Sequence, residues 1–324
     1  MEKYRRKVAR ILYYARNIAR DAAPQGLFRR RLASLLAEAG AHARDGIADR
    51  INYCNKLTGP LHEKEFRGTV ASISRQGSLY YYDLKEYARY FPRSFRLNYR
   101  YGDLVEVPDR PSFVKSRPLG SDNAAAILVK LDKFRHFQFP GDPIPFADKQ
   151  PRAVWRGINN NPLRVTLVEH HGNSPFADVA VSNRKGRGSG GVMHLSEQEQ
   201  MAYRYIISIE GNDVATNTKW IFASNSVCMM PRPTVETWFM EGRLRPGEHF
   251  AEVRRDFADL EEKILHYEAH PDEARAIIAN ANAWAATFRD EKRERLVSLL
   301  VMAKYFVLTG QMEAGPDLAG LIAT

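Results

Sequence analysis

The sequence predicts an α/β fold in which two domains follow an N-terminal helical segment. From Arg67 onward, short apolar runs bounded by glycine and proline alternate with helical patterns, which is typical of parallel, doubly wound sheets. Residues 139–151 contain four prolines and Gly141, a composition typical of a linker. With 324 residues, 44% of them hydrophobic, the chain is large enough for two ordinary domains. We therefore expect three parts: a basic helical segment over 1–45, a first domain over 46–145 and a second over 146–324.

Local patterns assign elements along this outline. Pro24 and Gly26 separate two helices, and the leucines and alanines of residues 29–40 have helical spacing. The remaining patterns predict strands over 70–73, 95–98, 165–169, 203–209 and 227–230. They predict helices over 83–90, 196–202, 219–224, 259–267, from Pro271 and over 290–310.

Most of the net charge of +10 lies at the N-terminus. Residues 1–31 contain ten Lys or Arg against Glu2 and Asp21, which gives +8. The same segment places Val8, Ile11, Leu12, Tyr14 and Ile18 at helical spacing. Two interpretations stay open: a helix that lies on an anionic membrane, or the solvated basic face of a helix that packs on the core.

The compartment is predicted from what the sequence lacks. The N-terminal residues carry charge at nearly every turn and lack the apolar run that is typical of a secretory signal, and no run of about 18 uncharged apolar residues occurs elsewhere. Cys54 and Cys228 are far apart and form neither a disulfide framework nor a CxxC site. We expect a cytoplasmic protein, peripheral on the inner face of the inner membrane.

The first candidate site is the segment YRYIISIEGNDVATNTKW, residues 203–220. An apolar strand leads through Glu210 and Gly211 to a helix that begins near Asn217, with Lys219 one turn in. Ligands bind at the carboxyl ends of parallel strands, where helix N-termini offer N–H groups to phosphate. An ordinary capped strand-to-helix turn would have the same pattern.

A second candidate site follows the proposed linker. Glycine permits close backbone approach and arginine matches phosphate oxygens, so Trp155, Arg156, Gly157 and Arg164 suit a diphosphate. They would equally suit a strand edge with surface arginines. The loop RKGRGSGG, residues 184–191, is a further candidate for gripping phosphate.

Asp103 is the candidate general base, since it follows a predicted strand at a glycine turn. Glu106 and Asp109 compete for the role, and all three would also serve as turn residues.

His249 and Glu241 are candidates for contacting the sugar or ribose, although such residues more often have structural roles. His170 and His171 have no third ligand at metal spacing, so the sequence predicts no metal site.

Taken in order, these segments and TWFMEGRLRPGEHFAEV (237–253) and DFADLEEKI (256–264) resemble glycosyltransferase family 90, the CAP10-like or lipopolysaccharide A family. That family includes protein O-glucosyltransferases, fungal capsule xylosyltransferases and bacterial lipopolysaccharide-core enzymes. The resemblance runs from about Tyr99 to Phe288, and the order of its motifs is more specific than any one of them.

The resemblance implies a GT-B-like fold, with two Rossmann-like domains facing a cleft and the donor nucleotide mainly on the C-terminal one. It implies inversion at the anomeric carbon without a metal or cofactor, with Asp103 as the base. The residues that match the donor-binding motifs of the family are Trp155, Arg156, Gly157, Arg164, Glu210, Gly211, Asn217 and Lys219.

The chain departs from the eukaryotic members, which place Ser and Arg where Ala215 and Asn217 stand. It also lacks their disulfides and retention signals, which favours the bacterial branch. The expected partners are a UDP-sugar donor and a glycan or lipid-linked oligosaccharide acceptor such as lipopolysaccharide core, without nucleic acid. The alternatives are a basic nucleic-acid-binding protein and another sugar-nucleotide enzyme of the same fold.

Overall fold

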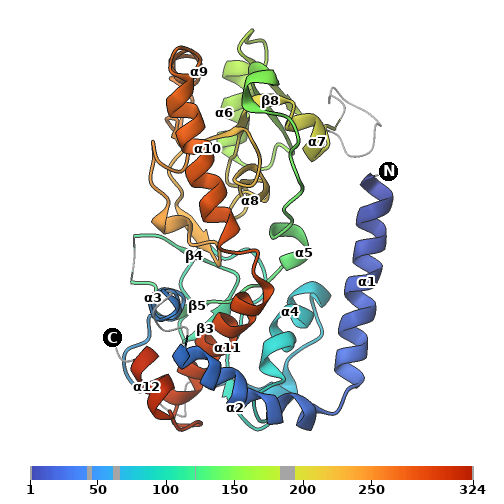
Figure 1. Cartoon of the computed structure of the whole chain (residues 1–324), viewed down its shortest axis with the longest axis vertical. Coiled ribbons are helices and arrows are strands. Elements are labelled where there is room, and N and C mark those ends of the chain that lie inside the picture. Colours follow the sequence, from blue (N-terminus) through green and yellow to red (C-terminus); the bar gives the residue numbers. More distant parts are fainter. Residues whose placement is uncertain (1, 42–45, 61–65, 121, 183–193, 323–324) are drawn as a thin grey trace. The chain divides into compact units, whose positions relative to one another are not determined.

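A computed structural model describes residues 2–41, 46–60, 66–120, 122–182 and 194–322 of the chain. The chain divides into two compact units, and Figure 1 labels most of its helices and some of its strands. The first unit contains Met1–Phe134 and Glu291–Thr324, and the second contains Arg135–Asp290. The helices from Glu291 onward, which were predicted to belong to the second domain, therefore belong to the first unit.

The first unit is mainly helical. Its core forms where α11 packs on α2, α3 and α4, and α12 packs on α2 and α3. A buried ion cluster lies inside it, in which the Glu294 carboxylate pairs with the Arg50 guanidinium at 2.5 Å and with the Lys130 ammonium at 2.6 Å. The helices are α1 (Glu2–Ala22), α2 (Gln25–Ala41), α3 (Ile47–Cys54), α4 (Ser78–Ala88), α11 (Glu291–Leu308) and α12 (Pro316–Ile322).

The strands of the first unit are short. β1 (Gly68–Thr69) pairs antiparallel with β2 (Arg96–Leu97), and β3 (Ser112–Val114) pairs parallel with β5 (Ala126–Leu128). β4 (Ser116–Pro118) follows β3 directly. The short helix α5 (Lys133–His136) contains the point at which the chain passes from the first unit to the second.

A five-stranded parallel sheet forms the centre of the second unit. Its order is β11-β9-β8-β6-β7. Strands β8 and β9 are almost continuously apolar because a parallel sheet is buried on both faces. The strands are β6 (Gln150–Gly157), β7 (Ala177–Val181), β8 (Tyr203–Ile207), β9 (Val227–Met230), β10 (Val235–Thr237) outside this sheet, and β11 (Ala251–Glu252).

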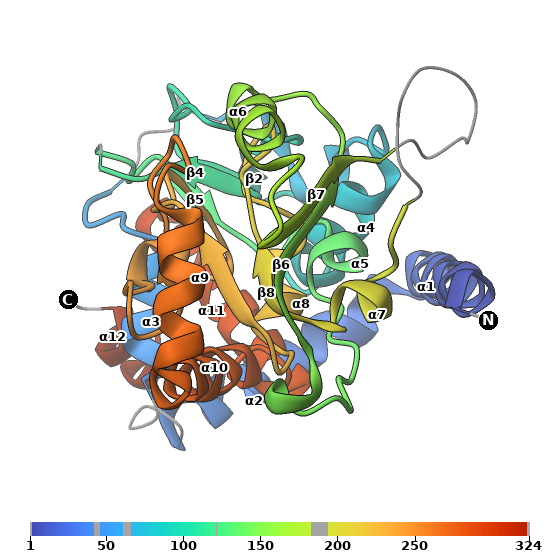
Figure 2. The same ribbon diagram turned by 90° about the horizontal axis from the view of Figure 1, so that it is seen from above.

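Helices pack on this sheet, and Figure 2 shows α9 and α10 beside it. Leu260 and Ile264 of α9, and Ala274 and Ile277 of α10, join the strand residues in one buried cluster. α10 begins at Pro271, as predicted, because proline lacks the N–H that a first-turn residue leaves unpaired. The helices are α6 (Pro162–His171), α7 (Glu197–Gln200), α8 (Thr218–Ile221), α9 (Leu260–Ala269) and α10 (Pro271–Ala286).

The α/β class with a parallel sheet is confirmed, and two predicted strands are wrong. Residues 165–169 lie within α6, because the Asn161 side chain caps its first turn and Leu163 and Leu167 have helical spacing toward the core. Residues 70–73 are not a strand either, since Val70–Ser72 forms a 3₁₀ turn that Thr69 and Ser72 cap reciprocally.

Candidate active site

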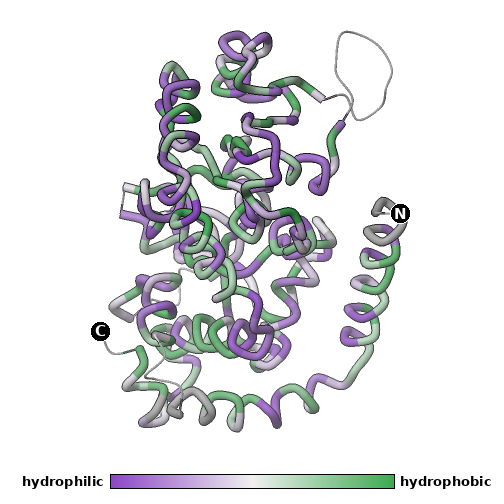
Figure 3. Tube along the Cα trace, turned by 45° about the horizontal axis from the view of Figure 1, so that its top comes forward, coloured by the Kyte–Doolittle hydropathy of each residue, from purple (hydrophilic) through white to green (hydrophobic). Residues whose placement is uncertain are grey.

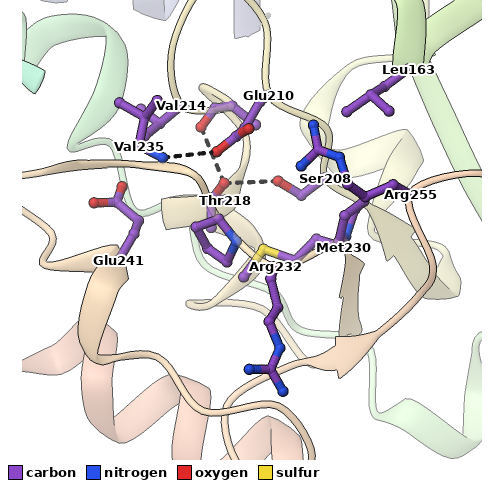
Figure 4. A pocket seen from close by; sticks show the side chains of 13 residues that line it. Leu163, Ser208, Glu210, Val214, Thr218, Met230, Arg232, Val235, Glu241 and Arg255 are labelled. Carbon is purple, nitrogen blue, oxygen red and sulfur yellow. Dashed lines mark hydrogen bonds between the residues drawn. The ribbon is translucent and has the colours of Figure 1, made fainter. Parts of the chain in front are cut away.

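A pocket that is partly open to solvent lies at the carboxyl edge of the sheet in the second unit (Figure 4). Ser208 and Glu210 come directly after β8, Met230 ends β9, and Arg255 follows β11. Leu163 of α6 contributes an apolar side chain. The strand ends of a doubly wound sheet are where such folds bind ligands.

The floor of the pocket is held by hydroxyl groups. Oγ of Ser208 lies 2.8 Å from Oγ1 of Thr218, and the Thr218 hydroxyl also donates to the Ala215 carbonyl at 3.1 Å. Asn217 donates to the Ile207 carbonyl at 3.0 Å, so its amide ties the turn to the end of β8. The helix that follows, α8, is only four residues long, so it provides a much weaker dipole than the sequence suggested.

Glu210 holds the opposite wall. One carboxylate oxygen accepts from the Thr234 N–H at 2.7 Å and from the Val235 N–H at 3.2 Å, while the other accepts from the Thr234 hydroxyl at 2.7 Å. The carboxylate therefore orders the loop after β9, and its oxygens are occupied by protein donors. The structure places it at the pocket in a supporting position.

Lys219 is fully buried and forms an ion pair with Glu241. Its Nζ lies 2.6 Å from Oε1 of Glu241 and 5.5 Å from the centre of the Phe239 ring. Glu241 also accepts from the Thr237 N–H at 2.6 Å. Glu241 lines the pocket, whereas Lys219 does not and holds the Glu241 carboxylate in place. The sequence motif had pointed to Lys219 more strongly than to Glu241.

Arg164 and Trp155 form a cation–π pair beside Gly157 and Gly211. The Arg164 guanidinium lies 5.9 Å from the centre of the Trp155 ring. A Cβ on Gly157 would lie 2.5 Å from the Trp155 ring, and one on Gly211 would lie 2.9 Å from the Arg164 guanidinium. A side chain at residue 157 or 211 would therefore displace part of this pair, and glycine lets the backbone approach it closely.

The guanidinium of Arg164 donates to backbone carbonyls rather than to a carboxylate. Its acceptors include the Ile158 and Ile209 carbonyls, both at 3.2 Å, and the side chain of Asn160 at 2.8 Å. Burial lowers the pKa of Arg164 from its usual value, which reflects the cost of a desolvated cation. Within the described part of the chain it has no acidic partner, so an anionic ligand would relieve that cost.

Arg156 differs from Arg164, because a carboxylate neutralises it. Its guanidinium donates to the Asp178 carboxylate at 2.6 Å, and the other carboxylate oxygen accepts from the Tyr203 hydroxyl at 2.7 Å. Burial raises the pKa of Asp178, but the bonds from Tyr203 and Arg156 outweigh it and leave the pKa below its ordinary value. This arrangement fastens β6 to β7 and β8.

The pocket is also lined by two arginines that the sequence analysis did not identify. Arg255 is exposed and, within the described residues, has no carboxylate partner. Arg232 is exposed too but pairs with Glu252 at 2.7 Å. Their positions just after β11 and β9 are the signal that would have identified them, since strand ends meet at one edge.

Asp103 belongs to the first unit. Its carboxylate pairs with the buried Nζ of Lys115 and accepts from the Tyr80 hydroxyl at 3.4 Å, while its side chain stays partly exposed. Tyr80 in turn stacks on Tyr101, with ring centres 5.6 Å apart. The alternatives Glu106 and Asp109 are more exposed than Asp103.

The remaining candidates have structural partners or lie outside the described residues. His249 is buried against Trp284 and accepts from the Arg245 N–H at 3.1 Å, and burial lowers its pKa below the usual value. The imidazole of His171 lies 2.8 Å from the Phe257 carbonyl, which fixes it to a neighbouring loop. The loop 184–191 lies outside the described residues.

One group with metal-ligand spacing occurs in the part of the chain that the structure describes. His266, His270 and Glu273 are exposed on α9 and α10, with their donor atoms within 4.8 Å of one another. Glu273 already lies 2.8 Å from His266 Nε2, and His270 Nδ1 faces the His266 carbonyl at 2.8 Å. His266 and Glu273 thus pair with each other and His270 faces a backbone carbonyl, and none of the three lines the pocket.

Comparison with known proteins identifies the family. The sequence profile described as "Glycosyl transferase family 90" matches residues 137–293. A protein named O-glucosyltransferase LpsA, from Dichelobacter nodosus, is 42% identical over 314 residues, which cover 95% of this chain and 98% of that protein. The chain belongs to glycosyltransferase family 90. The resemblance drawn from the sequence motifs is thereby confirmed, and the protein is a glycosyltransferase.

More distant family 90 relatives match a shorter stretch. Protein O-glucosyltransferase 2 from Danio rerio is 27% identical over 143 residues, 42% of this chain and 28% of that protein. Protein O-glucosyltransferase 3 from Homo sapiens is 22% identical over 167 residues, 49% of this chain and 32% of that protein. The pocket lies within the segment that the family profile matches, whereas Asp103 lies before it.

Proposed function

We propose that this family 90 enzyme transfers glucose from UDP-glucose to a hydroxyl of a cell-surface glycan, with inversion and without a metal ion. The observation that carries the donor assignment is the pocket at the carboxyl edge of the parallel sheet, which has cations in its wall and beside it that lack a carboxylate partner in the described structure. A nucleoside diphosphate has the complementary charge. Glucose is the first choice because the relative from Dichelobacter nodosus is named an O-glucosyltransferase.

Charge on the leaving diphosphate is the main electrostatic demand of the reaction. As the bond between the anomeric carbon and the phosphate oxygen breaks, its electron pair stays on the diphosphate, so positive groups fixed nearby lower the barrier. Arg164 and Arg255 are the side chains we assign to this role. Arg156 and Lys219 are neutralised by Asp178 and Glu241 and are assigned to support.

Asp103 is the proposed general base. It would take the proton from the acceptor hydroxyl while that oxygen forms the new bond to the anomeric carbon, and a single displacement inverts the centre. Lys115 and Tyr80 orient its carboxylate and leave it partly exposed. Asp103→Asn should reduce turnover by about 10² or more while donor affinity is retained.

The acceptor and location follow from the family and the basic N-terminus. Lipopolysaccharide core, or another lipid-linked glycan assembled on the cytoplasmic face of the inner membrane, is the proposed acceptor. Of the described helices, none is both long and apolar enough to cross a bilayer. We therefore propose peripheral association with that face.

Calorimetric titration with UDP in EDTA, beside GDP, CDP and ADP, tests the donor and the metal together. Selective binding of UDP in the presence of EDTA supports the proposal. Binding that appears only after Mg²⁺ or Mn²⁺ is added would contradict metal independence. No binding of any of the four nucleotides would contradict the donor assignment. Turnover with UDP-glucose against UDP-galactose and UDP-xylose then identifies the sugar.

A further inference from the structure

The outer surface of α1 contains an unusual concentration of exposed apolar side chains. Eight large hydrophobic residues are exposed in the described part of the chain, and half of them lie on this one helix. Their exposed fractions are 38% for Val8, 58% for Ile11, 63% for Leu12 and 56% for Ile18. Spacings of three, four and seven residues place Val8, Ile11, Leu12 and Ile18 on one face, which we call the outer stripe.

The opposite face of α1 is polar and packs on α4. The Tyr13 hydroxyl donates to Asp83 at 2.7 Å, Arg20 pairs with Glu86 at 2.8 Å, and Asp21 accepts from Tyr81 at 2.6 Å. A helix on a soluble protein normally buries its apolar stripe and exposes its polar face. In α1 the arrangement is inverted, so the outer stripe is not explained by the packing of this unit.

Basic side chains border the outer stripe. Lys7 and Arg16 lie at its two edges and are exposed, and Figure 3 shows the hydrophobic and hydrophilic residues alternating along the helix. With 21 residues, α1 is about 32 Å long but has too many charges to enter a bilayer lengthwise. An apolar stripe edged by cations is the pattern of a helix that lies in a membrane interface.

We propose that the outer stripe of α1 docks on an anionic lipid surface, with its aliphatic side chains among the acyl chains and its basic residues on lipid phosphates. A second copy of this chain would bring two strongly basic segments together, which charge repulsion disfavours. A nucleic acid would use the cations but leave the aliphatic side chains unsatisfied. The lipid surface alone uses both features.

Vesicle co-sedimentation of the full chain tests this docking without using the transferase reaction. Wild-type protein should bind vesicles of phosphatidylglycerol and phosphatidylcholine, bind pure phosphatidylcholine at least tenfold more weakly, and dissociate as salt rises. Leu12→Asp and Ile11→Asp should each weaken binding at least tenfold, since each loses an inserted side chain and adds a repelled charge. Arg16→Glu should weaken it on the anionic vesicles by at least fivefold.

Leu265→Asp is the matched control, because Leu265 is 52% exposed on α9 and outside the stripe. This variant should bind vesicles like wild type, and circular dichroism should show the same melting for all four variants, since each replaced side chain is exposed. Equal loss in Leu265→Asp, or unchanged binding in Leu12→Asp, would overturn the proposal. So would a chain that ignores vesicles but binds duplex DNA, or one that forms a dimer which Leu12→Asp dissociates. Nucleotide binding measured on the same samples separates these outcomes from a failure of the donor assignment.

Discussion

Two sets of cationic side chains in the second unit differ in the groups that they face. In one, Lys219 meets Glu241 and Arg156 meets Asp178, so each cation has a carboxylate within 2.6 Å. In the other, Arg164 donates only to carbonyl and amide oxygens, and Arg255 has no carboxylate partner within the described residues. Three of these four residues, Arg156, Arg164 and Lys219, match the donor-binding motifs of the family, and the motifs do not distinguish among them. The structure separates them, because a paired cation stabilises the fold while an unpaired one is available to an anion.

Breaking the buried pair should have the largest effect. Lys219→Met leaves Glu241 buried and uncompensated, so we expect the free energy of unfolding to fall by about 3–5 kcal/mol. Chemical denaturation measures it, with Lys263→Met on α9 as a control that should change little. Adding Glu241→Gln to Lys219→Met should restore part of the loss, since the amide oxygen can still accept from Thr237. A Lys219→Met protein of wild-type stability that had lost UDP affinity would reverse our assignment of this residue.

Removing an unpaired cation should affect the ligand instead. Arg164→Gln should weaken UDP binding by about 2–3 kcal/mol, or roughly 30- to 150-fold, because a charged hydrogen bond to phosphate is lost. Its unfolding free energy should change far less than that of Lys219→Met, since a desolvated cation is removed together with its bonds. Arg204→Gln, which breaks a partly buried pair with Glu268, is the control and should leave UDP affinity unchanged. Equal UDP affinity in Arg164→Gln and wild type would remove Arg164 from the donor site.

Gly211 lies close to Arg164, so a substitution there tests whether the position of the Arg164 guanidinium matters for UDP binding. We expect an effect smaller than that of Arg164→Gln. A Cβ at residue 211 would lie 2.9 Å from the guanidinium, whose flexible end can move aside. Gly211→Ala should therefore displace Arg164 and weaken UDP binding by about 1 kcal/mol, with little change in unfolding free energy. Gly141→Ala is matched to it, since no atom lies within 4 Å of its added Cβ. An unchanged affinity would mean that the position of Arg164 does not matter to the donor.

The sequence could predict those parts of the second unit that depend on local patterns, but not those that depend on contacts between residues far apart in the chain. Strands β8 and β9 were predictable because buried parallel strands are continuous apolar runs. The prediction of a strand over 165–169 was wrong because Val165, Thr166 and Val168 have high strand propensity. The Asn161 cap and the burial of Leu167 stabilise a helix there instead. The pairing of Lys219 with Glu241, 22 residues apart, follows from tertiary structure, and no local pattern reports it. The family motif includes Glu210, which lines the pocket, and Lys219, which supports Glu241 from outside it, and the sequence alone could not distinguish these two positions.

The smallest expected effect concerns Arg156 and depends on pH. The folded-state pKa of Asp178 lies below its ordinary value of 3.8, so the pair stabilises the fold above about pH 3.8 and loses that contribution as the pH falls through the folded pKa. Arg156→Gln should therefore cost about 1 kcal/mol at neutral pH, the scale of a partly exposed pair. Wild type and variant should converge in unfolding free energy as the pH falls below about 3.8. Urea denaturation across this range measures the convergence, and a difference that persisted at acid pH would show that Arg156 stabilises the strand ends by packing rather than by its charge.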